Sequence, residues 1–295
     1  MKLLVTGAQG QIVRSLIERA PFAGVEVIAL GRPALDMSEP AHVAAALEGV
    51  EADAIVNAAA YTAVDKAESE EALATRINGD AAGEIAALAH RRGLTFLHIS
   101  TDYVFDGESP RPYREDDPTG PIGAYGRSKL AGERAVRERD PGATILRTAW
   151  VHSPFGANFV KTMLRLGETR DELSVVADQL GSPSYAPDLA DAILGIAKRR
   201  VERRAENFGA GIYHMTGSGE ATWADLAEEV FTEAARLGRT PVHVKRIASA
   251  QYPTPAKRPN NSRLDNTRLG QDFGVHLPDW RASARACVNR LIGGK

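Results

Sequence analysis

Tyr125 and Lys129 are the residues whose types and spacing most directly suggest chemistry. A spacing of four residues in a helix places the two side chains on one face, one turn apart. A phenol ordinarily ionises at about pH 10, and a neighbouring ammonium group favours the phenolate. We therefore expect Lys129 to lower the pKa of Tyr125, as a site of proton transfer requires.

Thr101 adds a third polar group to this pair. It belongs to the segment Ser-Thr-Asp-Tyr-Val-Phe-Asp-Gly at 100–107, which follows an apolar run at 95–99. If that run is a strand in a parallel sheet, Thr101 lies at the strand's carboxyl end, where ligands bind in open α/β sheets. A hydroxyl there can hold a substrate oxygen that Tyr125 protonates. We predict a hydride-transfer site with Thr101, Tyr125 and Lys129 as its catalytic residues.

The elements that position these residues alternate along the chain. Strand-like apolar runs occur at 3–5, 25–30, 54–56, 95–99 and 144–147, and helical stretches at 11–20, 40–47, 70–91 and 128–139. This alternation predicts an α/β fold, a Rossmann-type doubly wound parallel sheet over residues 1–150. Later segments near 173–218 are expected to return to that sheet. Residues 151–172 and 219–295 are expected to form a smaller substrate-binding cap.

A glycine-containing turn at residues 7–13 stands between the first strand and the first helix. Gly7 permits a tight turn, and Gly10 lets backbone amides approach a pyrophosphate at the helix N-terminus. The third glycine of the dinucleotide fingerprint is replaced by Val13. The turn still predicts a dinucleotide site, because it directly follows a strand at the start of the chain.

The end of the second strand bears on the choice of dinucleotide. Sites that prefer NAD usually carry an acidic residue there, whereas this chain has Arg32. A guanidinium group suits a 2′-phosphate, so we predict NADPH, with NADH also possible. A surface role for Arg32 is the alternative. Asp36 and Met37 are expected near the adenine.

Composition restricts the possible partners. The net charge of −2 gives no basic surface for nucleic acid, and no apolar run is long enough to span a bilayer. The single cysteine, Cys287, is expected to be a buried thiol in a cytoplasmic protein. The seven histidines are scattered without metal-ligand spacing, so we expect no metal. A monomer and a homodimer are both possible.

Further motifs make the chain resemble the extended short-chain dehydrogenases/reductases, and among them the dTDP-4-dehydrorhamnose reductases. The matching segments cover nearly the whole chain: 57–68, 100–107, 147–151, 158–159, 178–183, 252–259 and 261–264. Some members of that family are described as magnesium-dependent through glutamates at a dimer contact. Position 15, where such a glutamate is expected, is Ser15 here.

The resemblance implies an activity and a set of roles. These reductases convert dTDP-4-dehydro-β-L-rhamnose to dTDP-L-rhamnose with NADPH or NADH. By resemblance Tyr125 protonates the sugar O4, Lys129 holds the nicotinamide ribose and Thr101 orients the carbonyl. The implied cofactor contacts also include Gly10, Gln11, Ile12, Ala60, Tyr61 and Thr62. The implied sugar contacts are Val64, Asp102, Tyr103 and Trp150, and we expect Arg258 and Arg263 to bind the diphosphate.

Two other functions remain open. One is a different nucleotide-sugar enzyme of the same superfamily, an epimerase or a dehydratase. A dehydratase is expected to carry an acidic pair after the strand-end threonine, whereas this chain has Asp102-Tyr103. The other is a non-catalytic subunit resembling the regulatory subunit of methionine adenosyltransferase. Intact Thr101, Tyr125 and Lys129 weigh against that function.

Overall fold

A six-stranded parallel sheet forms the centre of the computed structural model, which describes residues 1–293. The strand order is β10-β5-β4-β3-β1-β2, and all five pairings are parallel. The bounds are β1 (Lys2–Thr6), β2 (Glu26–Leu30), β3 (Ala54–Asn57), β4 (Thr95–Thr101), β5 (Thr144–Thr148) and β10 (Gly211–His214). The predicted fold class is confirmed.

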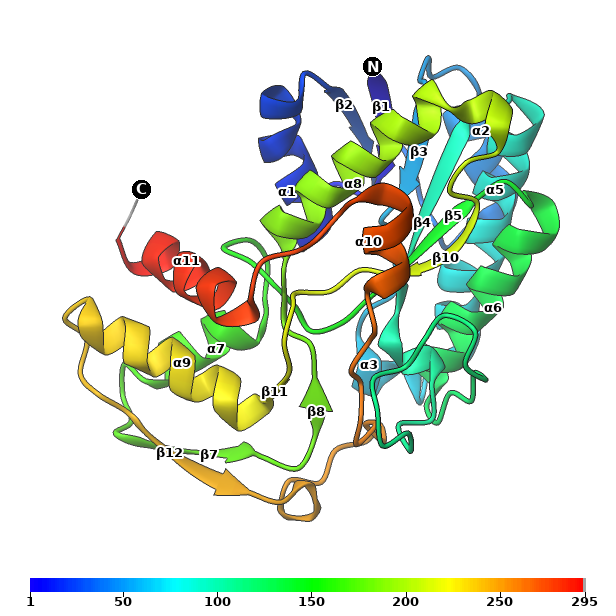
Figure 1. Cartoon of the computed structure of the whole chain (residues 1–295). Coiled ribbons are helices and arrows are strands. Elements are labelled where there is room, and N and C mark those ends of the chain that lie inside the picture. Colours follow the sequence, from blue (N-terminus) through cyan, green and yellow to red (C-terminus); the bar gives the residue numbers. More distant parts are fainter. Residues whose placement is uncertain (294–295) are drawn as a thin grey trace.

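Helices cover both faces of this sheet (Figure 1). On one face, α1 (Gln11–Arg19) and α8 (Ala186–Glu202) pack on Leu3 and Val5 of β1. On the other face, α2 (Pro40–Glu48) and α5 (Ala81–Arg91) pack on Leu4. Because alternate residues of a strand point to opposite faces, the run Leu3-Leu4-Val5 is apolar throughout and buried on both sides.

Two helices that carry site residues differ from their predicted form. The stretch predicted as one helix at 70–91 is α4 (Glu71–Thr75), a π-helical segment η2 (Arg76–Asp80) and then α5. The helix predicted at 128–139 is α6 (Ala124–Arg139), which begins four residues earlier. Tyr125 therefore lies in its first turn, with Lys129 one turn further along.

A second hydrophobic cluster lies apart from the sheet, on the left and lower side of Figure 1. It is enclosed by α7 (Phe159–Leu166), α9 (Trp223–Arg236), α11 (Trp280–Ile292), β7 (Glu172–Val176) and β12 (His243–Ile247). Cys287 is fully buried in it, as expected. The last two residues of the predicted cap range, 294–295, lie outside the described residues.

The expectation that the strand near 173 returns to the main sheet is wrong. β7 pairs in parallel with β12, and only β10 joins the main sheet from the second half of the described chain. The reason is visible in its burial: Leu173 and Val175 are buried whereas Glu172 and Ser174 are exposed. A strand inside a doubly covered parallel sheet needs apolar residues on both faces.

Short elements complete the described chain. They are the pair β6 (Val151–His152) and β9 (Ser184–Tyr185), the pair β8 (Leu180–Gly181) and β11 (Ala221–Thr222), α3 (Val64–Ala67), α10 (Thr267–Phe273), and the short turns η1 (Ala20–Ala23), η3 (Asp102–Val104), η4 (Arg204–Glu206) and η5 (Ser249–Gln251). Within residues 1–293, no helix has the length and apolar character needed to cross a membrane.

Candidate active site

The carboxyl ends of the central strands bring polar side chains together at one edge of the sheet. Thr6 ends β1, Asn57 ends β3 and Thr101 ends β4. The Thr6 hydroxyl donates to Asn57 Oδ1 at 2.6 Å and accepts from the Ala59 amide at 3.1 Å. The Asn57 amide nitrogen in turn lies 3.0 Å from His98 Nδ1. These bonds fix the chain where it leaves β3.

Val13 packs against Gly7 of the glycine turn. Gly7 has φ of +97°, a left-handed conformation that favours glycine. A Cβ on Gly7 would lie 3.3 Å from Val13 Cγ2, so the valine occupies space that Gly7 leaves free. Val13 is only 1% exposed and belongs to the core. A branched residue is tolerated here because it packs inward, away from the amides of the turn.

The first turn of α1 has the form of an anion site. Its N-cap is Gly10, which offers no side chain to the first amides, and its first turn holds no acidic residue. Gly31, which faces the turn from the end of β2, has no room for a Cβ, which would lie 2.9 Å from the Ala8 amide nitrogen. Open amides at a helix N-terminus bind phosphate groups. The turn therefore fits the pyrophosphate of a dinucleotide.

Gln11 and Ile12 follow Gly10 on α1. The Gln11 amide nitrogen donates to Val151 O at 3.2 Å, and its Oε1 accepts from Ser153 at 2.8 Å and Asn158 at 3.0 Å. Ile12 is half-buried against the core. The Gln11 side chain thus ties the phosphate turn to the segment after β5, which leaves the backbone amides of these two residues to face a ligand.

The three residues predicted near the adenosine lie after β2. Arg32 is exposed, as a cation for a 2′-phosphate must be. Asp36 accepts from the Ser38 amide at 2.9 Å and the Ser38 hydroxyl at 2.7 Å, and these bonds lower the pKa of Asp36. Met37 is 7% exposed and packs in the core beside the sheet. The adenine contacts of Asp36 and Met37 stay predictions.

The structure brings Thr101, Tyr125 and Lys129 together. Lys129 is 3% exposed, and its ammonium donates to Ile99 O at 2.7 Å. The Thr101 hydroxyl donates to Asp102 Oδ1 at 2.9 Å and lies beside the Tyr125 phenol. The Tyr103 ring packs edge-on against Tyr125 with centroids 5.6 Å apart. A phenol, a hydroxyl and an ammonium group therefore converge where β4 ends.

Burial dominates the ionisation of these groups. Burial raises the pKa of Tyr125 to about 12, although the Thr101 hydroxyl acts in the opposite direction. The expected lowering by Lys129 is not found, because its ammonium is directed at the Ile99 carbonyl. Burial also lowers the pKa of Lys129 to about 8 and raises the pKa of Asp102 to about 6. Tyr125 is accordingly a protonated group that can donate at neutral pH.

Asn78 is a site residue that the sequence did not reveal. Its Oδ1 accepts from the Tyr61 amide at 2.8 Å, and its amide nitrogen donates to Tyr61 O at 3.1 Å and Ser128 Oγ at 2.9 Å. Ser128 donates to Tyr125 O at 2.7 Å. Asn78 lies in the π-helical η2, a form that recurs at functional sites but leaves no periodic signal in a sequence. Asn78 connects the loop after β3 to α6.

That loop carries the next group of predicted contacts. Ala60, Tyr61 and Thr62 lie between β3 and α3, and Val64 begins α3. The Tyr61 hydroxyl donates to Glu70 Oε2 at 2.5 Å, while the two Asn78 bonds hold its backbone. The loop is therefore anchored through both the backbone and the side chain of Tyr61.

The two arginines predicted for the diphosphate differ in their surroundings. Arg258 Nη2 lies 3.0 Å from Asp65 Oδ2, and its Nη1 is buried without a hydrogen-bond partner among residues 1–293. Arg263 donates to Glu220 at 2.6 Å, to Asn261 Oδ1 at 2.9 Å and to Pro110 O at 2.9 Å. Arg258 therefore has hydrogen-bonding capacity left for a ligand, whereas Arg263 is engaged at all three nitrogens.

Known proteins resemble the chain throughout its length. A family model described as the RmlD substrate binding domain matches residues 1–292. The dTDP-4-dehydrorhamnose reductase of Sinorhizobium fredii is 48% identical over 292 residues, 99% of this chain and 98% of that protein. The chain belongs to the dTDP-4-dehydrorhamnose reductase family. The family predicted from the motifs is thereby confirmed.

Solved structures agree with that assignment. The crystal structure of a dTDP-4-dehydrorhamnose reductase from Clostridium acetobutylicum has a TM-score of 0.89 and 38% identity, with 99% of each chain covered. The enzyme of that name from Bacillus anthracis, in complex with NADP, has a TM-score of 0.88 and 33% identity. The match covers 97% of this chain and 98% of that one.

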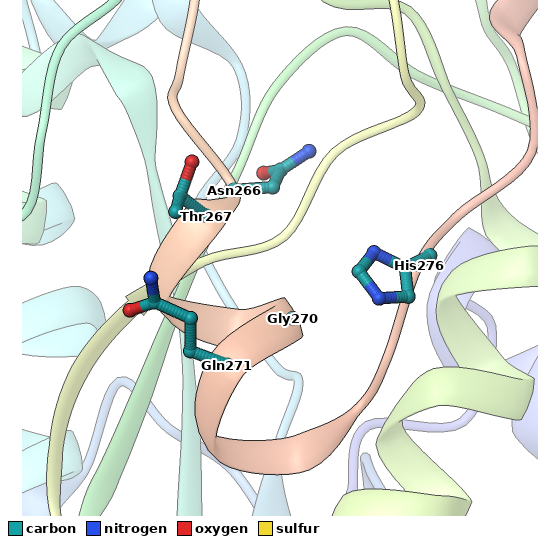
Figure 2. Close-up of a pocket in the computed structure, with 5 residues that line it drawn as sticks. All are labelled: Asn266, Thr267, Gly270, Gln271 and His276. Carbon is teal, nitrogen blue, oxygen red and sulfur yellow. The ribbon is translucent and has the colours of Figure 1, made fainter.

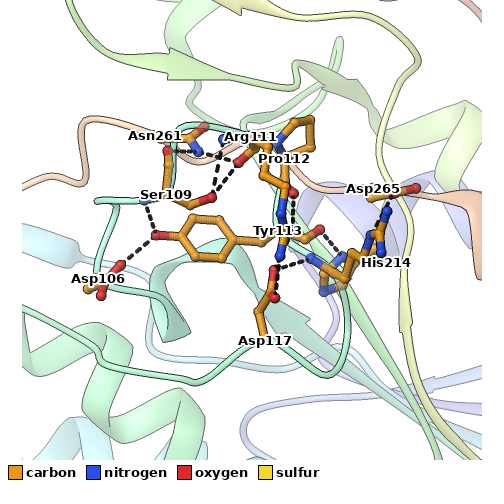
Figure 3. A network of polar contacts seen from close by, with 10 residues as sticks. Asp106, Ser109, Arg111, Pro112, Tyr113, Asp117, His214, Asn261 and Asp265 are labelled. Carbon is orange, nitrogen blue, oxygen red and sulfur yellow. Dashed lines mark hydrogen bonds and ion pairs between the residues drawn. The ribbon is translucent and has the colours of Figure 1, made fainter.

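A polar network holds the segment that follows Thr101 (Figure 3). The Tyr113 hydroxyl donates to Asp106 at 2.5 Å, and the Tyr113 carbonyl lies 3.1 Å from His214 Nδ1 on β10. Asn261 donates to Ser109 O and to Arg111 O, both at 2.8 Å. The segment 106–117 is thus bound to the main sheet and to the loop that carries Arg258.

Trp150, predicted to line the sugar pocket, connects the sheet to the second cluster. It has φ of +47° and stacks on Trp223, with centroids 3.5 Å apart and planes within 5°. A Cβ on Gly181 would lie 2.2 Å from the Trp150 ring, so the indole presses against glycine backbone. Its contact with a sugar in this family member stays a prediction.

One surface hollow lies outside the predicted site. A cavity of about 460 Å³ lies beside α10 and the segment after it, lined by Asn266, Thr267, Gly270, Gln271 and His276 (Figure 2). None of these is a predicted site residue, and the Thr267 and Gln271 side chains come from one exposed turn of α10. Among residues 1–293 no group of histidine, cysteine and acidic residues could hold a metal ion.

Proposed function

We propose that the chain reduces the C4 carbonyl of dTDP-4-dehydro-β-L-rhamnose with NADPH, giving dTDP-L-rhamnose, with NADH as a possible second donor. The observation that supports this best is the convergence of Thr101, Tyr125 and Lys129 at the end of β4, beside an open phosphate turn. Membership of a reductase family with an NADP-bound structure supports the choice of reaction and cofactor.

The cofactor would be held by residues along the sheet edge. The amides around Gly10, Gln11 and Ile12 would bind the pyrophosphate, and exposed Arg32 would bind the 2′-phosphate. Lys129 would contact the nicotinamide ribose, with the loop 60–62 closing the other side. When bound, NADPH supplies the hydride that C4 accepts.

The chain's own residues manage the proton. As C4 accepts the hydride, the electron pair of the carbonyl bond moves to O4, which takes the proton from the Tyr125 hydroxyl. Tyr125 carries this proton at neutral pH, because burial raises its pKa to about 12. The Thr101 hydroxyl would orient O4 and would donate a hydrogen bond to the phenolate that remains.

The sugar nucleotide would occupy the space between these residues and the loop that carries Arg258. Val64, Asp102, Tyr103 and Trp150 would contact the sugar. Arg258 would bind the diphosphate, exchanging its contact with Asp65 for the more strongly charged ligand. Arg263 would support the loop rather than contact phosphate. The buried single thiol is compatible with a reducing compartment, and we propose the cytoplasm.

Replacement of Tyr125 tests this proposal. Tyr125→Phe removes the donated proton and is expected to lower kcat by about 10² to 10⁴-fold while leaving NADPH affinity near that of the wild type. Tyr213→Phe is the matched control, because the Tyr213 hydroxyl bonds Asp272 on α10, away from the site. Near wild-type turnover by Tyr125→Phe would show that another group is the acid.

A further inference from the structure

A buried ion pair lies beneath the catalytic helix. From β5, Arg147 donates its Nε to Glu133 Oε1 at 2.8 Å and its Nη2 to Oε2 at 2.7 Å. The two side chains are only 2% and 3% exposed. The Ser100 hydroxyl, on β4, donates to the same Oε1 at 2.6 Å. Three hydrogen bonds from two strands therefore hold one carboxylate of α6.

The position of this carboxylate links it to the catalytic residues. Glu133 lies one helical turn after Lys129, as Lys129 lies one turn after Tyr125. Lys129 bonds the carbonyl of Ile99, Glu133 bonds the hydroxyl of Ser100, and Tyr125 lies beside Thr101. Three consecutive residues of β4 thus each contact a different turn of α6, although the contacts do not follow the order of the turns.

The same ion pair also contacts the segment that follows Thr101. The Arg147 guanidinium lies over the Phe105 ring, 4.9 Å from its centroid. Phe105 stacks on Tyr113, with centroids 4.1 Å apart, and Tyr113 anchors the network of Figure 3. Glu133 is therefore linked through Arg147 and Phe105 to the segment that follows Thr101.

Energetics argue against a purely stabilising role for the pair. Burying two charges costs so much desolvation free energy that well-packed apolar residues often stabilise a fold as well or better. Glu133 does, however, place a negative charge one turn from a buried ammonium. It raises the pKa of Lys129, opposing the burial that brings this pKa down to about 8.

We propose that Glu133, clamped by Arg147 and Ser100, is a positioning residue that supplies the counter-charge for Lys129 and fixes the register of α6 on β4. The proposal rests on the proposed roles of Tyr125 and Lys129. Glu133 differs from these two residues because its carboxylate is buried and already bonded to Arg147 and Ser100, so it would act through Lys129 and not on a ligand.

The other titratable groups near Lys129 do not raise its pKa as Glu133 does. His98 on β4 is buried, and burial together with the Lys129 charge keeps its pKa well below the usual value, so it stays neutral. Asp102 on η3, whose pKa burial raises to about 6, is ionised where Lys129 titrates, but Glu133 is the carboxylate that acts on the pKa of Lys129. Tyr125, whose pKa burial raises to about 12, is neutral there. On η2, Asn78 contacts α6 with a neutral amide, which donates to Ser128 Oγ. The ion pairs from α4 and α5 reach its outer face, at Glu71–Arg127 and Glu84–Arg139.

The test is a direct titration of Lys129 in the ligand-free chain. The ε-carbon of 13C-labelled lysine reports ionisation by NMR, and the Lys129→Met variant assigns the signal. In the wild type we expect a midpoint at about pH 8. In Glu133→Gln we expect the midpoint to fall by about one pH unit, because the nearest negative charge is lost. With Lys129 less charged, NADPH should bind about threefold more weakly at pH 7.5.

Two further variants make the result decisive. Glu133→Gln leaves Arg147 buried without its partner and can fail to fold, so the second variant is Glu133→Gln/Arg147→Met, which removes both charges. Its midpoint should be lowered too, because Glu133 and not Arg147 acts on the pKa of Lys129. Glu84→Gln/Arg139→Met, which removes an outer ion pair of the same helix, should leave the midpoint unchanged. A wild-type midpoint in the folded Glu133/Arg147 double variant overturns the proposal. Absence of sugar reduction by the wild type would refute the proposed function instead, since the titration needs no ligand.

Discussion

Gly126, the residue after the proposed acid, lies where α6 packs tightly against η3. A Cβ on Gly126 would lie 2.2 Å from the carbonyl oxygen of Tyr103 and 2.9 Å from Pro121 Cβ. The first neighbour is backbone, which cannot rotate away as a side chain can. Gly126→Ala must therefore separate α6 from η3 by about 1 Å to restore ordinary contact.

The magnitude follows from two opposing effects. Alanine gains at most about 1 kcal/mol over glycine in a helix, whereas overpacking a tight contact costs about 1–3 kcal/mol. We expect a net loss of about 1–2 kcal/mol in the free energy of unfolding. A displacement of about 1 Å at the proton donor should also lower kcat by about 10²-fold, because reacting groups must remain in near-attack geometry.

Gly195 provides the matched control. It lies within α8, and a Cβ there would have no neighbour within 4 Å. Gly195→Ala should therefore raise the free energy of unfolding by about 0.5–1 kcal/mol and leave turnover unchanged. Urea denaturation and steady-state kinetics of both variants are the assays. Equal stability and equal kcat for Gly126→Ala and the wild type would refute the close-contact reasoning.

Two further predictions concern charge. The pKa of Asp102, raised by burial to about 6, exceeds its unfolded value, so the native state loses stability as pH rises from about 4 through 6. Asp102→Asn should consequently be more stable than the wild type by about 2–3 kcal/mol at pH 8, with the gain vanishing near pH 4; a pH-independent difference in urea denaturation would contradict this. Arg32→Ala should raise KM for NADPH by about tenfold or more and leave KM for NADH unchanged, and equal effects on both would exclude a 2′-phosphate contact.

Much of the sheet was predictable because its signals are local. The apolar runs of β1 to β5, and the position of Thr101 just after one of them, follow from a few neighbouring residues. The same holds for Tyr125 and Lys129, whose spacing alone places them on one helix face. The glycine turn was also predictable, although only the structure explains how Val13 is accommodated.

The features that escaped prediction depend on contacts between distant segments. β7 was recognisable as a strand, but its pairing with β12 joins residues about 70 positions apart, which no local pattern encodes. Likewise the contact of Arg258 with Asp65 spans the chain. Glu133 has the sequence appearance of a solvated helix residue, and only the approach of Arg147 from β5 explains its burial.

Asn78 illustrates a different kind of difficulty. The alanine-rich stretch at 70–91 has uniform helical character, so an ordinary helix was the natural prediction. A π turn is determined by packing against a neighbour. Here that neighbour is Gly132 of α6, where a Cβ would lie 2.1 Å from Asn78 O. In the sequence, Gly132 is the residue whose type reflects this close contact.

We propose that NADPH bound at this sheet edge donates a hydride to the sugar C4 while Tyr125 donates the proton. Transfer of label tests it most directly. The wild-type chain, given NADPH deuterated at nicotinamide C4 and dTDP-4-dehydro-β-L-rhamnose, should yield dTDP-L-rhamnose with deuterium at C4, detected by NMR and mass spectrometry. Tyr125→Phe should yield little of this product. Oxidation of the cofactor without deuterium at C4, or no reaction by the wild type, would contradict the account.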